Sequence, residues 1–300
     1  MYLESALRLN DPGARMGRAL PYLLLTPTVL LFLAVFVYPL SEGIRASLDD
    51  YRFGRPAGGA GLQNYIDVLR DEQFRGALSA TVRFVLFAVP LETALGLALA
   101  LLCAREMPLV RTVRTVLIVP MIIMPIVVGI VFRLIYASDA GLLTVVARTL
   151  GGNSVNILTS DSLSFVAIIV MDVWEWTPLM FLILLAGIQS LPVEPFEAAR
   201  VDGASSWRIL MDHTLPMLRP VLAVAVVLRM IDAFGTFDQV FILTNGGPGT
   251  ATQLIGLYGY KTAFKFVEVG FAAAMMLMVA LVALTLAFLA VRLIQQRAET

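Results

Sequence analysis

The sequence predicts an all-α membrane protein with six transmembrane helices. Of its 300 residues, 59% are hydrophobic and only 15% are charged, and the mean hydropathy is +0.84. A soluble domain is close to half apolar and a quarter charged, so this apolar excess is too large for one globular core. A bilayer is an apolar solvent that accounts for the excess, and helices are the expected way to cross it because they satisfy their own backbone hydrogen bonds.

Six apolar stretches reach the roughly 20 residues that a spanning helix needs. They cover residues 21–40, 79–103, 113–136, 163–188, 220–243 and 269–294. The first is too long for a signal-peptide core and no small-residue cleavage site follows it, so we expect it to persist as a span. Residues 1–20 then form an amino-terminal tail and residues 21–300 one transmembrane domain. Several spans contain proline, which a helix bundle in a membrane tolerates as kinks.

Basic residues in the short loops predict the orientation, because cytoplasmic loops carry an excess of arginine and lysine. One side of the predicted bundle carries Arg8, Arg15, Arg18, Arg105, Arg111, Arg114, Arg200, Arg208, Arg219, Arg292 and Arg297. The loops on the other side contain Arg148, Lys261 and Lys265, together with a long first loop whose arginines are offset by acidic residues. We therefore expect both termini to be cytoplasmic.

Residues 191–216, between the fourth and fifth spans, predict a short helix-turn-helix on the cytoplasmic side. Pro195 fits the first turn of a helix, and Gly203 can end that helix in a positive-φ conformation. Ser205 or Ser206 can cap a second helix, which we expect Pro216 to close before the next span. The mixed apolar and charged faces of this loop suit docking to another protein.

This loop resembles the EAA signature of binding-protein-dependent ABC permeases. The resemblance rests on Glu197-Ala198-Ala199, on Gly203 four residues later, and on Leu215-Pro216 beyond. Residues 243–249, Leu-Thr-Asn-Gly-Gly-Pro-Gly, are similar to the carbohydrate branch of that family, and within it to the first permease of maltose or glycerol-phosphate importers. The resemblance implies the type I ABC importer permease fold and a sugar or sugar-derived solute.

In that family the loop couples transport to ATP hydrolysis on a separate subunit. The resemblance implies that Glu197 pairs with a basic residue of the ATPase and that Gly203 allows the sharp turn. The implied coupling residues are Glu197, Ala198, Ala199, Asp202, Gly203, Leu215 and Pro216. The implied partners are a second homologous permease, two ATP-binding cassette subunits and an extracytoplasmic solute-binding protein, all acting at the bacterial cytoplasmic membrane. His213 departs from the family's usual apolar residue, and we expect an interface role for it.

Charged residues inside the fourth and fifth spans predict buried pairs or a wet pathway. Asp172, Glu175 and Trp176 share one helix face through spacings of three and four. A charge at a helix centre costs about 2.5–3.5 kcal/mol on insertion scales, so such residues face the bundle interior. We expect Asp172 or Glu175 to pair with Arg229. Glu92, in the second span, also needs a partner, which the sequence does not identify.

Two interpretations of these charges stay open. They line the solute pathway, or they form an ion pair that locks the fourth span to the fifth. The family resemblance favours the pathway, because residues at these distances from the EAA loop contact substrate in related sugar permeases. The candidate pathway residues are Asp172, Glu175, Trp176, Leu179, Arg229, Asp232, Ala233 and Thr236.

The sequence lacks the residues of several other protein classes. No G-x-x-x-x-G-K-[ST] phosphate loop occurs, so we expect ATP and Mg to be bound by the partner ATPase and no cofactor by this chain. The single histidine and single cysteine, Cys103, exclude multi-His or multi-Cys metal sites. No nucleophile–base pair suggests catalysis. The alternative function is an ion-coupled secondary transporter, whose ion sites would be the intramembrane carboxylates.

Overall fold

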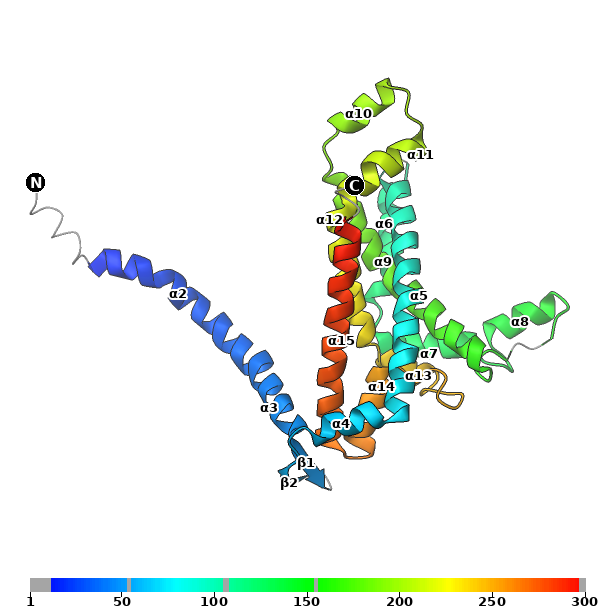
Figure 1. Ribbon diagram of the computed structural model, residues 1–300. Helices are drawn as coiled ribbons and strands as arrows, with labels where there is room; N and C mark the ends of the chain where they lie inside the picture. Colours follow the sequence, from blue (N-terminus) through cyan, green and yellow to red (C-terminus); the bar gives the residue numbers. More distant parts are fainter. Residues whose placement is uncertain (1–11, 53–54, 105–107, 154–155, 297–300) are drawn as a thin grey trace, which may run out of the picture.

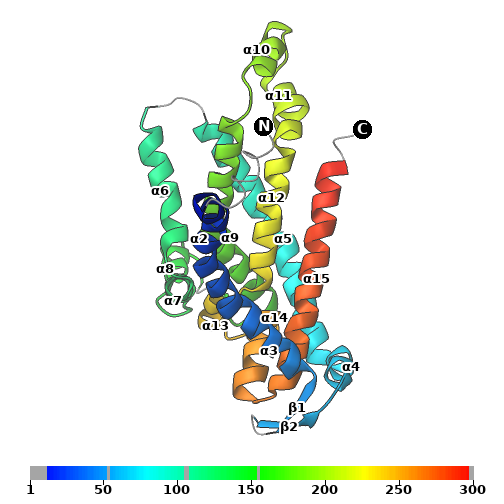
Figure 2. The ribbon, with the colours of Figure 1, turned by 90° about the vertical axis from the view of Figure 1, so that its left-hand side faces the viewer.

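The computed structural model describes residues 12–52, 55–104, 108–153 and 156–296. The predicted tail residues 1–11, and the orientation residues Arg105 and Arg297, lie outside this part of the chain. The described chain is helical apart from one small hairpin, which agrees with the predicted fold class. Figures 1 and 2 show a long bundle with α10 and α11 at one end and the hairpin at the other.

The first span is a helix that projects from the bundle (Figure 1). It runs through α2 (Pro12–Phe32), a π-helical turn η2 (Leu33–Val37) and α3 (Tyr38–Ser47). Its apolar segment, Tyr22–Ser47, has a mean hydropathy of 2.3 and none of its most apolar window is buried within the chain. The helix is longer at both ends than the predicted 21–40, and only its α3 end packs on the bundle, against α15.

A short hairpin and helix connect this projecting helix to the bundle. Strands β1 (Asp49–Arg52) and β2 (Arg55–Gly59) pair antiparallel, and α4 (Gln63–Arg70) follows. The amide of Asn64 donates to the backbone carbonyls of Ser47 and Asp49 at 2.9 and 3.0 Å. These bonds fix α4 to the start of the hairpin.

Four long helices form the bundle: α5 (Glu72–Cys103), α9 (Asp161–Gln189), α12 (Leu215–Phe234) and α15 (Val269–Gln296). Small residues let their backbones approach, as in other membrane helix pairs. A Cβ on Gly96 of α5 would lie 2.7 Å from the Cβ of Met180 on α9. Cys103 is buried at the end of α5, next to Phe181 and Leu184 in the apolar cluster near α10.

The third predicted span is not one straight helix. It consists of α6 (Val110–Ile122) and α7 (Pro125–Ile135), which meet at an angle of 95°. Ile123 and Met124 are extended, because the residue before a proline disfavours the helical region. The predicted span over 113–136 is therefore sharply bent within its length, and the helix α8 (Leu142–Thr149) follows the bent pair.

The fifth predicted span ends earlier than residue 243. Helix α12 stops at Phe234, and α13 (Asp238–Leu243) is a separate short helix packed against α7. A Cβ on Gly129 of α7 would lie 2.9 Å from the carbonyl oxygen of Gln239, so glycine permits this contact. The chain continues through α14 (Ile255–Tyr260) and the π-helical η4 (Lys261–Lys265) to α15.

The predicted helix-turn-helix contains α10 (Glu194–Val201) and α11 (Ser206–Ile209). Gly203 has φ +77°, and the amides of Gly203 and Ala204 donate to the carbonyls of Arg200 and Ala199, which forms a Schellman cap. The Ser205 hydroxyl caps α11 by accepting from the amide of Arg208. Both features agree with the predicted turn.

The second helix of this loop is not closed before the fifth span. It continues through a π-helical turn, η3 (Leu210–Thr214), directly into α12. Pro216 lies inside a continuous helix, two residues after the π-helical turn, and does not end it. The loop therefore joins the fifth span through a continuous helical connection.

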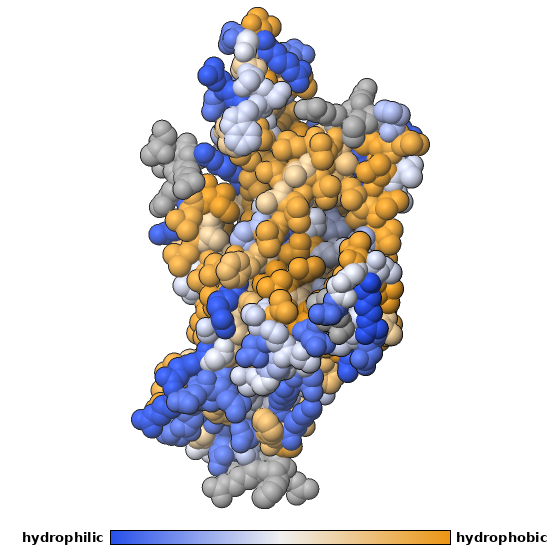
Figure 3. Space-filling view, turned by 90° about the vertical axis from the view of Figure 1, so that its right-hand side faces the viewer, coloured by the Kyte–Doolittle hydropathy of each residue, from blue (hydrophilic) through white to orange (hydrophobic). Residues whose placement is uncertain are grey.

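The face of the molecule shown in Figure 3 has an apolar middle and two hydrophilic ends. The apolar middle covers the long helices, and hydrophilic residues gather at the α10 end and at the opposite end. Within the described residues, five helices are long and apolar enough to span a membrane, and the bent pair α6–α7 makes the count six if it is one span. This agrees with a protein that crosses the bilayer several times.

Candidate functional site

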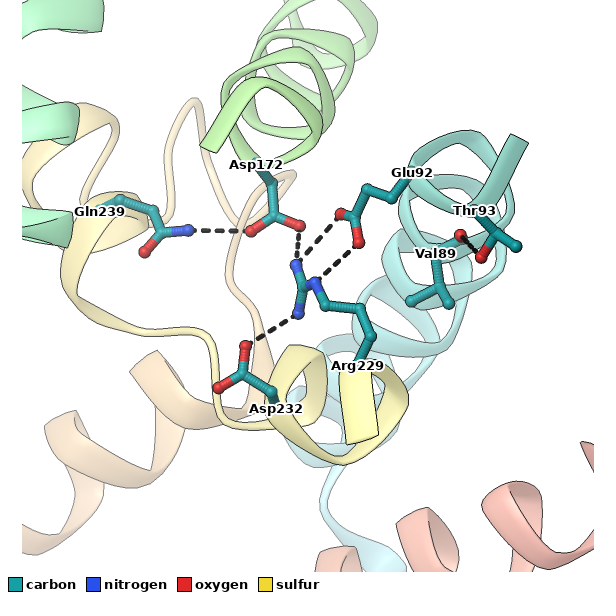
Figure 4. Close-up of polar contacts among 7 residues, drawn as sticks. All are labelled: Val89, Glu92, Thr93, Asp172, Arg229, Asp232 and Gln239. Atoms are coloured by element: carbon teal, nitrogen blue, oxygen red, sulfur yellow. Dashed lines mark hydrogen bonds and ion pairs between the residues drawn. The ribbon is translucent and has the colours of Figure 1, made fainter. Parts of the chain in front are cut away.

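The centre of the bundle holds a buried arginine, Arg229 of α12 (Figure 4). Its side chain is fully buried, which in a membrane requires compensation by acidic partners. Three carboxylates, from three helices, surround its guanidinium group. The sequence produces this arrangement because α5, α9 and α12 each carry an acidic residue at the same depth.

Each guanidinium nitrogen has a carboxylate partner. Nε lies 2.7 Å from Oε2 of Glu92 on α5, and Nη2 donates to Oε1 of Glu92 at 3.2 Å. Nη2 also donates to Oδ2 of Asp172 on α9, and Nη1 donates to Oδ2 of Asp232 on α12 at 3.0 Å. The network therefore ties α5, α9 and α12 together through charge-assisted hydrogen bonds.

Two further residues extend the network towards α13 and towards a cavity. The amide Nε2 of Gln239 donates to Oδ1 of Asp172 at 2.9 Å. The indole of Trp176 lies with its ring centroid 5.2 Å from Cζ of Arg229, a cation–π contact. Trp176 thus has the ion network on one side and the cavity on the other.

The cavity has a volume of about 350 Å³ and lies beside Trp176 and Asp232. It is lined by Pro125, Trp176, Ile231, Asp232, Gly235, Thr236, Phe237, Asp238 and Gln239. The side chain of Asp232 is 51% exposed, so its carboxylate faces the cavity as well as Arg229. Aromatic walls with a few placed polar groups are typical of small-molecule sites.

The structure separates the eight candidate pathway residues into groups. Trp176, Asp232 and Thr236 line the cavity, and Asp172 and Arg229 form the ion network behind it. The paired carboxylate is Asp172 and not Glu175, whose buried Oε2 has no hydrogen-bond partner in the described chain. Ala233 is buried, and Leu179 is half-buried on α9 and does not line the cavity.

Sequence reasoning missed several residues of this site. Glu92 lacked an assigned partner, yet it holds Arg229 with both of its oxygens. Gln239, Phe237 and Asp238 were missed because the chain was expected to stay helical to residue 243, whereas the break after Phe234 turns α13 back to the cavity. Glu92 and Arg229 lie inside two different apolar spans, and intramembrane charges need partners of opposite sign. This was a sequence signal for their pairing.

The coupling-loop candidates lie together at the far end of the molecule (Figure 1). Glu197 and Ala198 are exposed on α10, Ala199 is buried, and Asp202 and Gly203 form the exposed turn. Leu215 and Pro216 are half-buried at the start of α12. His213 is half-buried in η3 between these groups.

A bundle of membrane-spanning helices, with a polar cavity beside a buried ion network and an exposed helical loop at one end, defines a membrane transport subunit. The family of binding-protein-dependent transport system inner membrane components matches residues 94–300, and the chain belongs to this family. Family membership favours an importer permease over the ion-coupled alternative.

Individual relatives agree with this assignment. The chain is 37% identical to the probable ABC transporter permease protein y4oQ of Sinorhizobium fredii, over 81% of this chain and 80% of that one. It is 36% identical to the trehalose/maltose transport system permease protein MalF of Thermococcus litoralis, over 86% of each chain. A chain of a bacterial alginate ABC transporter, crystallised with an alginate-bound periplasmic protein, has the same fold, with a TM-score of 0.82, 22% identity, and coverage of 97% of this chain and 99% of that one.

Proposed function

We propose that this chain is the permease subunit of an ABC importer that moves a sugar or sugar-derived solute across the cytoplasmic membrane. The observation that carries the proposal is the cavity beside Trp176, Asp232 and Thr236, in a member of a transport family. An indole face and polar side chains suit the apolar and hydroxylated faces of a sugar. The trehalose/maltose permease among the relatives supports a sugar as the solute.

Two partner ATPase subunits, which dock on the loop that contains α10 and α11, bind ATP with Mg and hydrolyse the ATP. Exposed apolar side chains at this end, Val193, Val201 and Trp207, support a protein contact there. Glu197 lies among them, as expected for the coupling glutamate. Because ATPase subunits are cytoplasmic, this end faces the cytoplasm, and both termini lie on that side.

A second, homologous permease completes the membrane part of the complex. The segment Tyr22–Ser47 supports this, since it projects from the bundle and the described chain buries none of its apolar window. Side chains such as Phe32 and Phe36 are more than half exposed. Packing on a neighbouring subunit would order this helix in the membrane.

The opposite end of the molecule receives the extracytoplasmic solute-binding protein. This end carries the hairpin and α4 (Figure 2). The loop at Asn245–Gly249 contains positive φ angles at Asn245, Gly246 and Gly249, and Nζ of Lys261 donates to the carbonyl of Asn245 at 2.9 Å. The loop is therefore a shaped turn rather than a nucleotide-binding segment.

The test is reconstitution of the complete complex. The chain is expressed with its ATPase, second permease and binding protein, purified, and placed in liposomes with labelled maltose or trehalose as probes. We expect uptake that requires ATP on the side of α10 and requires the binding protein. Uptake by this chain alone, driven by an ion gradient and without ATP, would establish the secondary-transporter alternative instead.

A further inference from the structure

A row of aromatic side chains leads from the cavity to the surface at the end that carries α4. Phe237 lines the cavity. Its ring centroid lies 4.8 Å from that of Tyr260, and the Tyr260 centroid lies 5.4 Å from that of Phe264. Phe264 is 75% exposed, so the row is half-buried at the cavity and open at its other end. We call Phe237, Tyr260 and Phe264 the aromatic row.

Neighbouring groups hold this row in place. Phe241 stacks on Phe237 at 5.4 Å and contacts Tyr260 at 5.7 Å, and Nζ of Lys265 lies 5.8 Å from the Phe241 ring centroid. A Cβ on Gly256 would lie 3.0 Å from the carbonyl oxygen of Thr236, so glycine lets α14 approach the cavity wall. The row is therefore built from two separate chain segments that the fold brings together.

The direction of the row matches an entry route. Tyr260 ends α14, and Phe264 lies in η4 one turn further along. The chain then reaches Gly270, where a Cβ would lie 3.0 Å from the side-chain amide nitrogen of Asn64 on α4, at the end opposite α10. Under the proposed function this is the side on which the binding protein delivers the solute.

The chemistry of the row fits pyranose rings. One face of a pyranose presents C–H groups, which pack flat on aromatic rings, while its edges carry hydroxyl groups. The Tyr260 hydroxyl forms no hydrogen bond with any other described residue and is free for a solute hydroxyl. The cavity has an aromatic wall as well, Trp176, so a ring leaving Phe237 meets another flat surface.

We propose that Phe264, Tyr260 and Phe237 form a sugar-binding track that guides pyranose rings from the outer surface into the cavity beside Trp176. This inference rests on the proposed function and adds a site for the solute outside the cavity. An apolar packing role for the same rings requires only hydrophobic volume, whereas the track requires a flat face at each position. Substitutions that keep a large apolar side chain but remove the ring separate the two roles.

The experiment measures ATP-dependent uptake of maltose and trehalose by the reconstituted complex. We expect Phe264→Leu and Tyr260→Leu each to lower the uptake rate roughly tenfold, the factor that the loss of one strong aromatic contact gives. Phe264→Tyr, which keeps the flat ring, retains the rate. Phe266→Leu is the matched control, because Phe266 is 61% exposed two residues away and has no ring contact in the described chain. Complex yield and basal ATPase activity stay unchanged in all four variants.

Three outcomes decide between the alternatives. Wild-type uptake rates with leucine at positions 264 and 260 would overturn the track while leaving the proposed function intact. Loss of complex yield in Phe264→Leu would assign this ring to a subunit contact and would also overturn the track. If the wild-type complex imports neither disaccharide, the proposed sugar function itself fails, and the track fails with it.

Discussion

Nε of Arg229 lies 2.7 Å from Oε2 of Glu92, although the two residues are 137 positions apart in the sequence. Both side chains are fully buried, and Asp172 and Asp232 share the same guanidinium. The pair joins the second span to the fifth, at the depth of the cavity. It therefore connects these two spans, and Arg229 also contacts Trp176, which lines the cavity.

Removing the arginine is expected to destabilise the protein strongly. Arg229→Met leaves three carboxylates without their cation, and breaking such a buried pair typically costs about 3–5 kcal/mol. The thermal unfolding midpoint and the yield of the purified complex measure this loss. Arg148→Met, at an exposed position on α8, is the control and should behave as wild type. In the Arg229→Met background, Glu92→Gln should cost less than it does in the wild type, because the two residues are coupled.

Replacing Asp232 distinguishes a role in solute transport from a purely structural role for this residue. Its carboxylate is half exposed to the cavity, so Asp232→Ala removes a polar contact for the solute while Glu92 and Asp172 still hold Arg229. We expect uptake to fall about tenfold or more, which corresponds to one hydrogen bond with a charged group. Asp139→Ala, at an exposed position, is the control. Unchanged uptake and unchanged coupling to hydrolysis would leave Asp232 with a structural role only.

Glu197, one of two exposed glutamates on α10, should affect the coupling of ATP hydrolysis to uptake without affecting folding. Glu197→Ala is expected to reduce uptake at least tenfold while the complex still assembles and hydrolyses ATP, because a charged contact across an interface is lost. The ratio of solute transported to ATP hydrolysed is the measurement. Glu194→Ala changes an exposed acidic residue on the same helix. Equal ratios in the two variants would argue against a specific role for Glu197.

The turn after α10 depends on a left-handed residue. Gly203 has φ +77°, a conformation that costs a branched side chain about 1–2 kcal/mol. We expect Gly203→Val to disturb the loop and weaken co-purification with the ATPase, whereas Gly203→Asn, which tolerates this conformation, keeps it. Quantifying the ATPase in affinity-purified complexes tests this. Equal recovery of the ATPase with Gly203→Val and with Gly203→Asn would contradict a requirement for the left-handed backbone conformation at position 203.

The charge of the cavity should select against anionic solutes. Its lining contains Asp232 and Asp238 but no lysine or arginine among the described residues, and the nearby guanidinium of Arg229 is enclosed by carboxylates. We expect maltose to compete for uptake at least tenfold better than a uronic-acid disaccharide of similar size. Competition assays at low and high salt measure this, because the repulsion is screened by ions. A preference for the anionic sugar at low salt would contradict the charge argument.

Hydropathy predicted most of the spans, because a run of apolar residues has few other uses in a membrane protein. It did not predict the 95° bend between α6 and α7, since residues on both sides of the bend are equally apolar. Pro125 was a local signal for that break. The end of α12 at Phe234 was also missed, although the polar residues Asp238 and Gln239 follow it closely. The short helix α13 beyond this break packs on α7.

The sequence predicted candidate site residues on α9 and α12, but it did not predict their partners on α5 and α13. Spacing along a helix placed Asp172 and Trp176 on one face of α9, and the structure has both beside Arg229. Spacing along one helix contains no information about which neighbouring helix lies opposite. Glu92 and Gln239 reach the site through contacts between α5, α9, α12 and α13. The intramembrane charge of Glu92 indicated that it needs a partner, but Gln239 is assigned by the three-dimensional arrangement alone.

The exposed apolar surface of the helix through Tyr22–Ser47 has a consequence for how long this chain persists in the membrane. Under the proposed function, a chain made in excess of the second permease would leave most of this helix without protein contacts, and we expect membrane proteases to degrade it. Pulse-chase labelling should therefore show a short half-life for this chain when it is produced alone and a long one when its neighbour is supplied.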